Sequence, residues 1–313
     1  MLRYIVRRLI YMTPILFGVS LVIFLILHLV PGDPARLVAG LDATKEDVEI
    51  IRSSLGLDRP LPVQYVKWLE RVVVHGDLGR SIATRRPVVQ DVMDALRNSV
   101  ILAVASSLLA LAPGLVLGTL AAFRRGTVVD KIVSAIAITG VSVPHYWAAI
   151  ILVIVFSVRL NWLPAMGGPS EPSLGSYVHH MLLPAVALAL IPLGVITRVV
   201  RAAVLEILAQ EFVLTLRMKG LHAGALVRHV LKNAAPQILT VMGLQFGFAL
   251  GGSVLVETVF SWPGTGYLLN IAIFQRDMPL LQGIILVLST VFVLLNLAVD
   301  VLQGLIDPRI VRG

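Results

Sequence analysis

Six long apolar segments limit what this chain can fold into. A helix that crosses a bilayer needs about 20 mostly apolar residues. Six segments approach this length: Leu9–Val30, Ser99–Phe123, Ile132–Val158, Met181–Thr197, Ile238–Phe260 and Leu280–Val299. The fourth is short, but its helix can continue out of the membrane through "RVVRAAVLEIL". The sequence therefore predicts an all-α integral membrane protein with six transmembrane helices.

The composition is that of a membrane protein. Hydrophobic residues make up 57% of the chain and charged residues only 14%, whereas soluble domains have about 25% charged residues. The net charge of +8 could suggest a nucleic-acid partner, but no aromatic and basic motif supports one. The absence of cysteine excludes disulfides, thiol catalysis and cysteine-based metal sites. We therefore expect the lipid bilayer, and no nucleic acid, around this chain.

The N-terminal segment could be a cleaved signal peptide or a retained first span. Both begin with basic residues followed by an apolar run. Here the apolar run has no formal charge from Leu9 to Val30, and the following "VPGDPAR" is a poor cleavage site. We therefore expect the first span to be retained.

Lysine and arginine residues predict the orientation, because they accumulate in short cytoplasmic loops. The short loops after the third and fifth spans hold only Arg159 and Arg276. The opposite side carries Arg3, Arg7, Arg8, Arg124, Arg125, Lys131, Arg198, Arg201, Arg217, Lys219, Arg228, Lys232, Arg309 and Arg312. Both termini are therefore expected to be cytoplasmic.

The segment 31–98 is not apolar enough to cross a membrane and is expected outside the cytoplasm. Two short helices are predicted in it, one ending near Gly56 and the next ending just before Gly76. The stretch "RPVVQDVMDALRNS" predicts a third helix at the membrane interface, with Val88 and Val92 on its apolar face. The segment is thus a small helical appendage.

These predictions divide the chain into three parts. Residues 1–30 hold the cytoplasmic N-terminus and first span, 31–98 the extracytoplasmic segment, and 99–313 a five-span core. Within the core, 201–236 is a long basic cytoplasmic segment. An ordinary loop is the weaker interpretation of it, because most such loops are shorter and less regular.

The stretch "EFVLTLRMKGLHAGALVRHVLKNAAP" (211–236) predicts two helices around a glycine. Residues 211–219 favour a helix, and Gly220 can end it by taking a left-handed conformation. "HAGALVRHVLKNAA" then favours a second short helix. We expect a helix–glycine–helix unit that projects from the membrane.

The first part of this stretch, "EFVLTLRMKGL", resembles the cytoplasmic EAA loop of permease subunits in bacterial ABC importers. More narrowly, it is similar to the dipeptide/oligopeptide/nickel transport permease family. Leu216 and Met218 depart from alanines common in that family, and Gln303 from a common tyrosine. Other motifs similar to that family follow in order: VPGDP (30–34), LGLDRPLPVQYVKWL (55–69), GDLGRS (76–81), SVPHYW (142–147), LNWLPAMG (160–167), LLPAVALAL (182–190), ETVFSWPGTGYLLNIAIFQRDMPLLQG (257–283) and DPR (307–309).

The resemblance implies a type I ABC importer permease-like fold in the bacterial cytoplasmic (inner) membrane. It implies three kinds of partner: a homologous second permease subunit, two ATP-binding cassette ATPase subunits and an extracytoplasmic substrate-binding protein. ATP and magnesium would bind to the ATPases, since the sequence has no phosphate-binding G-x-x-x-x-G-K-[ST] motif. This chain would bind no cofactor or metal and catalyse no reaction. The implied cargo is di- or oligopeptides, and nickel complexes, glutathione and other small solutes are alternatives because members of that family share the scaffold.

The resemblance also implies that the basic segment couples ATP hydrolysis to transport. Its short helix would sit in a groove of an ATPase subunit. Closure of the two ATPases would then rock the membrane helices between inward- and outward-open states. The coupling residues implied are Glu211, Thr215, Arg217, Lys219, Gly220, Leu221, Leu226, Arg228, His229 and Asn233.

Candidates for the translocation path or outer gate lie in and around the last two spans. They are Gln245, Ser253, Glu257, Trp262 and Asn296. Glu257 is the only formal charge within the predicted spans, and such a charge is costly and often functional. It could face the path or pair with a basic residue such as Arg276, and a structural or gating role is favoured. The other polar side chains could line the path or bond between helices, and Trp262 could be a plain interfacial anchor.

A self-contained secondary transporter or channel is the alternative function. It would need ion-coupling groups near the middle of the membrane, and the predicted spans offer almost none. An intramembrane enzyme has less support, because the sequence contains no Ser/His/Asp arrangement or H-E-x-x-H motif at membrane depth. The permease is therefore the favoured interpretation.

Replacing Gly220 with a bulky β-branched residue, as in Gly220→Val, is expected to uncouple ATP hydrolysis from uptake. Such a side chain resists the left-handed conformation that the glycine is predicted to supply. ATPase activity and solute uptake are to be measured in parallel. Unimpaired uptake in the variant would contradict the coupling role.

Overall fold

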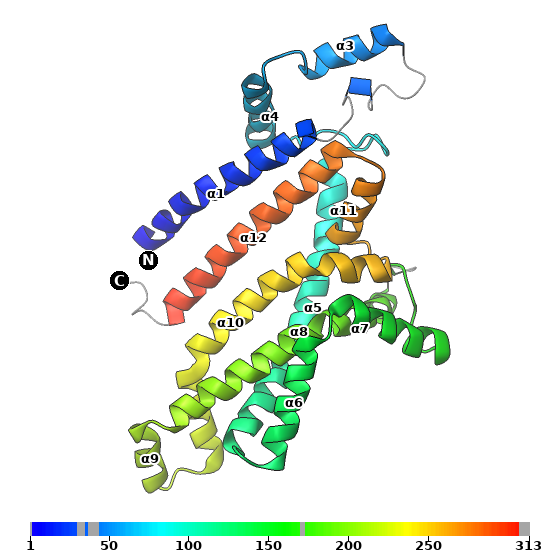
Figure 1. Ribbon diagram of the computed structural model, residues 1–313. Coiled ribbons are helices and arrows are strands. Elements are labelled where there is room, and N and C mark those ends of the chain that lie inside the picture. The colour runs from blue at the N-terminus through cyan, green and yellow to red at the C-terminus, as the bar shows by residue number, and fades with distance from the viewer. Residues whose placement is uncertain (1, 30–34, 37–43, 170–172, 307–313) are drawn as a thin grey trace. The chain divides into compact units, whose positions relative to one another are not determined.

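The computed structural model describes residues 2–29, 35–36, 44–169 and 173–306. The motifs at 30–34 and 307–309, and Arg312, lie outside the described residues. The helices are α1 (Leu2–Leu29), α3 (Lys45–Leu55), α4 (Leu61–His75), α5 (Val88–Phe123), α6 (Val128–Ser142), α7 (His145–Leu152), the π-helical η1 (Val153–Arg159), α8 (Leu174–Leu208), α9 (Glu211–Met218), α10 (Ala223–Phe260), α11 (Thr265–Phe274) and α12 (Met278–Ile306) (Figure 1). Among the described residues, the only β pairing is an isolated bridge between Arg80 and Pro87.

The candidate membrane spans agree with the six predicted from the sequence. Among the described residues, five helices are long and apolar enough to cross a bilayer: α1, α5, α8, α10 and α12. The bent pair formed by α6 with α7 and η1 makes a sixth when it is counted as one span. The all-helical, six-span fold class is thereby confirmed.

The third predicted span, 132–158, is bent far more than a simple kink. The helix direction bends by 100° between the two halves of the pair. Val143 has an extended backbone (φ −86°, ψ 120°) at the break. Pro144 follows at the N-terminus of α7. Proline has no N–H to donate and disfavours the helical conformation of the residue before it. The break therefore falls where the sequence has a proline.

The chain divides into two compact units, of which one contains Asn98–Tyr267 and the described part of Leu294–Gly313. In this unit α8 packs between α6 and α10 (Figure 1), and 61% of its most apolar stretch is buried. Glycines allow this close packing. A Cβ atom on Gly118 would lie 2.6 Å from the Thr197 carbonyl oxygen, and one on Gly194 would collide with the Ala137 carbonyl. The centre of this unit is thus protein-packed.

The same unit confirms that the fourth span is longer than its apolar core. α8 runs from Leu174 to Leu208, well past the predicted Met181–Thr197. Its N-terminus is capped by Ser173, whose hydroxyl accepts a hydrogen bond from the Ser176 backbone N–H at 3.2 Å. Helix α8 therefore spans the distance between the two functional regions described below.

The other unit contains the described residues of Val6–Arg97 and Leu268–Val293. The two predicted helix ends are confirmed, because Gly56 (φ +70°) and Gly76 (φ +62°) both take the left-handed conformation. Helix α4 rests on α1 through a hydrogen bond of 2.8 Å between the hydroxyls of Tyr65 and Ser20. The appendage is thus tied to the first span within its own unit.

The predicted interfacial helix before the second span is wrong in two respects. Val88 and Val92 are completely buried against Ala272, Leu280 and Ile284, so this face packs on protein and not on lipid. The helix also continues without interruption into the second span as α5. No proline or glycine separates the two parts in the sequence, so nothing breaks the helix there.

The contact at Gly118 gives a prediction about stability. Gly118→Ala would place its Cβ atom 2.7 Å from Val200 Cβ and should lower the free energy of unfolding by about 1–3 kcal/mol, as other overpacking changes do. The matched control is Gly251→Ala on α10, whose added Cβ would meet no atom within 4 Å. Unfolding is to be measured for both purified variants in detergent. Equal stability of the two variants would contradict the packing argument.

Candidate functional site

Helix α9 joins α8 to α10 (Figure 1). One apolar face anchors α9 to the protein. Val213 is only 1% exposed, and Phe212 and Leu216 pack beside it. Their neighbours in the same apolar cluster include Val204 of α8 and Val230 of α10. This face fixes α9 to the ends of two membrane helices, so a force on α9 acts on both of them.

The opposite face of α9 is exposed and partly apolar. Leu214 is 62% exposed and Met218 80% exposed. Glu211 and Thr215 are exposed beside them, and spacings of three and four residues place all four on one side of a helix. Exposed apolar groups with polar neighbours are typical of protein-binding surfaces. We call these four residues the α9 outer face.

The structure separates the predicted coupling residues by exposure. Those that are exposed are Glu211, Thr215, Arg217, Lys219, Gly220, Arg228, His229 and Asn233. Leu221 is half-buried. Leu226 is buried in the apolar cluster under α9, where it supports the helix. Leu214 was not among the predicted residues, although its spacing from Glu211 and Met218 could have indicated it.

Gly220 has the conformation predicted for it. Its φ is +75°, in the left-handed region, and its N–H donates to the Arg217 carbonyl oxygen at 3.0 Å. The segment that follows differs from the prediction of a second short helix. It is the first part of α10, which continues from Ala223 to Phe260, so the basic segment and the fifth span form one helix.

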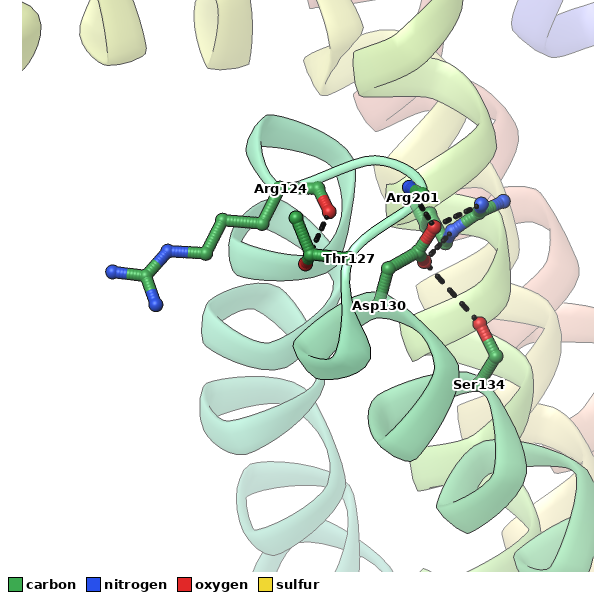
Figure 2. A network of polar contacts seen from close by, with 6 residues as sticks. Arg124, Thr127, Asp130, Ser134 and Arg201 are labelled. Carbon is green, nitrogen blue, oxygen red and sulfur yellow. Dashed lines mark hydrogen bonds and ion pairs between the residues drawn. The ribbon is translucent and has the colours of Figure 1, made fainter.

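An ion pair braces the end of α8 that leads to α9 (Figure 2). Arg201 of α8 donates from Nε and Nη2 to the carboxylate of Asp130 at 2.6 and 2.9 Å. The Gly126 N–H donates to the same carboxylate at 2.9 Å. Planar guanidinium and carboxylate groups joined by two hydrogen bonds define both distance and angle. The pair therefore holds the start of α6 against α8.

A second polar network surrounds Glu257, near the other end of α10. Glu257 is completely buried, and its carboxylate accepts hydrogen bonds from Ser99 Oγ at 2.6 Å and the Gly266 N–H at 2.7 Å. Ser99 Oγ in turn accepts from the Thr265 N–H at 2.8 Å. These bonds tie the turn between α10 and α11 to α5. Glycine is required at both positions of the turn, because an added Cβ atom on Gly264 would collide with Glu257 and Ser99, and one on Gly266 would collide with Val254 Cα.

Trp262 belongs to the same region and is completely buried. Its indole N–H donates to the Asn98 carbonyl oxygen at 3.3 Å, and its ring meets that of Tyr177 edge-on at a centroid distance of 5.4 Å. Tyr177 also donates from its hydroxyl to Asn98 Oδ1 at 2.9 Å. The aromatic rings thus link Asn98 of α5 and the start of α8 to the end of α10, and Trp262 is a core residue.

The other candidate path residues lie in different settings. Ser253 is buried, and its hydroxyl donates to the Leu250 carbonyl oxygen within α10 at 3.1 Å. Asn296 is half-buried on α12. Gln245 lines a cavity, and its Oε1 atom is buried without a partner among the described residues.

The fold has a counterpart among solved structures. It is similar to a chain from a structure described as inward facing conformations of the MetNI methionine ABC transporter. The TM-score is 0.58 and the sequence identity 17%, and the match covers 69% of this chain and 96% of that chain.

The sequence comparisons identify the family. Residues 114–312 match the family described as binding-protein-dependent transport system inner membrane component, and residues 1–103 match the N-terminal region of such components. The chain belongs to this family and is a permease subunit of an ABC importer. This confirms the resemblance found in the sequence.

Two curated relatives have nearly the same length. The chain is 40% identical over 311 residues to the glutathione transport system permease protein GsiC of Escherichia coli (strain K12). It is 38% identical over 332 residues to the dipeptide transport system permease protein DppB of Alkalihalophilus pseudofirmus. Each match covers 99% of both chains.

The Glu257 network gives a prediction. Glu257→Leu should lower the free energy of unfolding by about 1–3 kcal/mol, because the buried Gly266 N–H would lose its acceptor. Glu257→Gln should cost less, since its amide oxygen can still accept that bond. Both variants are to be compared by thermal unfolding in detergent. Equal thermal stability of Glu257→Leu and Glu257→Gln would contradict a stabilising role of the network.

Proposed function

We propose that this chain forms half of the membrane pathway of an ATP-driven importer of di- or oligopeptides. Its family membership supports transport dependent on a binding protein. The relatives named for glutathione and dipeptide transport support peptides as cargo, since glutathione is itself a tripeptide. The α9 outer face carries the proposal, because an importer permease needs a surface through which ATP hydrolysis acts on it.

The α9 outer face is the proposed docking surface for an ATP-binding cassette ATPase subunit. Leu214 and Met218 would enter a groove of the ATPase, and Arg217, Lys219 and Arg228 would pair with acidic groups around it. Val213, on the buried side, packs in one cluster with residues of α8 and α10 and would pass the motion to both helices. Gly220 keeps the turn between α9 and α10 short. Glu211, Thr215, Leu221, His229 and Asn233 are proposed to share this coupling role.

The proposed complex contains four other subunits around this chain. They are a homologous second permease, two ATPases that bind ATP and magnesium, and an extracytoplasmic substrate-binding protein. Both termini and α9 would face the cytoplasm, and 31–98 would lie outside. The three-part division into 1–30, 31–98 and 99–313 is retained on this basis. The basic segment was predicted to begin at residue 201, but residues 201–208 belong to α8. The proposed coupling segment therefore begins at α9.

The network around Glu257 is the proposed outer hinge of the pathway. It joins three helices by hydrogen bonds between buried groups, which supports a gating role more than contact with the solute. Ser253 and Trp262 would act with it. Asn296 is proposed to face the pathway from α12.

A self-contained secondary transporter remains the competing function, and uptake driven by different energy sources separates the two. Vesicles that keep ATP but have no membrane potential should still import peptide. Loss of uptake under that condition, with ATPase subunits absent from the purified protein, would overturn the proposed function.

The docking surface is tested by Leu214→Asp. A charge at this exposed apolar position should weaken ATPase docking by about 2 kcal/mol, the size expected of an interface anchor, while leaving the fold intact. The measurement is the amount of ATPase subunit that co-purifies with the permease, together with peptide uptake. The matched control is Leu174→Asp, at a position 82% exposed at the far end of α8. Equal ATPase recovery from both variants would contradict docking at α9.

A further inference from the structure

A cavity of about 400 Å³ lies among four helices of the unit that contains α8. It is lined by Val104, Ser107, Leu108 and Leu111 of α5, Pro192 and Ile196 of α8, Leu239, Met242, Gly243, Gln245 and Phe246 of α10, and Leu295, Ala298 and Val299 of α12. Small-molecule sites are typically cavities of about 300–1,000 Å³ with mostly apolar walls and few polar groups. The cavity has both properties.

The shape of the cavity depends on Gly243. An added Cβ atom there would lie 2.5 Å from both γ-methyl groups of Val299. The glycine therefore lets α12 approach α10 closely at this point. The close contact forms one wall of the cavity from backbone and small groups.

One polar group in the lining lacks a partner. Gln245 Oε1 is buried and accepts no hydrogen bond from any described residue. Leaving a buried acceptor unpaired is unfavourable, and the backbone N–H groups around it are used within α10. A lipid acyl chain in the cavity would offer no donor. An occupant with both an apolar group and an N–H group would satisfy the walls and the acceptor together.

We propose that this cavity is a binding site, within one permease subunit, for a peptide during its passage. An apolar side chain of the peptide occupies the cavity, and a peptide N–H donates to Gln245 Oε1. This inference rests on the proposed peptide import and adds a preference for apolar side chains. A free cation is a poor occupant, because no charged residue lines the cavity. A sugar is also a poor occupant, since its many hydroxyls would meet only Gln245 and Ser107 as polar side chains.

Thiol protection tests the site directly. The chain has no cysteine, so Ser107→Cys introduces the only thiol of this subunit into the lining. The complete transporter is reconstituted in lipid vesicles and labelled with a maleimide, and the labelling of this subunit is measured. Dileucine at several times its dissociation constant should slow labelling about fivefold. Binding divides the labelling rate by one plus the ratio of the ligand concentration to the dissociation constant. Diglycine, which has no side chain, should leave the rate unchanged.

Four further variants separate the site from general effects. In the Ser107→Cys background, Gln245→Met keeps the side-chain length but removes the acceptor, and should weaken the dileucine protection about three- to tenfold in apparent affinity. Leu239→Phe fills the cavity and should abolish the protection. Leu244→Phe, on the exposed side of α10 and outside the cavity, should leave it intact. Ser142→Cys, an exposed position on α6, should label equally with and without peptide.

The outcomes distinguish this inference from the proposed function. Uptake of dileucine by the wild-type transporter, measured in the same vesicles, tests peptide import by itself. Uptake without protection of Cys at position 107, or equal protection by both dipeptides, overturns the cavity site and leaves peptide import standing. If neither dipeptide is taken up, dipeptide import is overturned and the proposed site with it.

Discussion

Helices in a bilayer must satisfy their own backbone polar groups, and they approach one another closely only where side chains are small. In this permease α8 makes two such close approaches. Gly118 of α5 and Gly194 of α8 leave no room for a Cβ atom. Because these contacts fix the position of α8 against its neighbours, residues near its two ends meet defined polar partners. Asp130 braces Arg201 at one end, and Asn98 receives the Tyr177 hydroxyl at the other.

The local features that the sequence predicted well are those in which one residue decides the backbone. Gly56, Gly76 and Gly220 each end or follow a helix with a positive φ, as predicted. Pro144 marks the break in the third span for the same reason. The 100° angle at that break could not be predicted, because it depends on how α7 packs against its neighbours. Helix α5 was divided in the prediction because its polar and apolar parts differ in composition, although no residue breaks it.

The functional residues show the same limit. The sequence identified α9 by its resemblance to a coupling loop, but it could not separate the buried Leu226 from the exposed Leu214. That difference depends on the apolar cluster beneath α9, to which three helices contribute. Likewise, Asp130 has no distinctive sequence pattern, because its partner Arg201 is 71 residues away. The groups that donate hydrogen bonds to Glu257 are a serine on α5 and backbone N–H groups. They could not be predicted either, since a sequence does not show which backbone groups will meet a side chain.

The uninterrupted length of α8 has a mechanical consequence. Its 35 residues make a rod of about 52 Å at 1.5 Å per residue. If such a rod pivots near its middle by about 10°, each end is displaced by about 4.5 Å, roughly the width of a methylene chain. A small rotation at the level of the glycine contacts therefore becomes a movement large enough to open or close a passage for a solute.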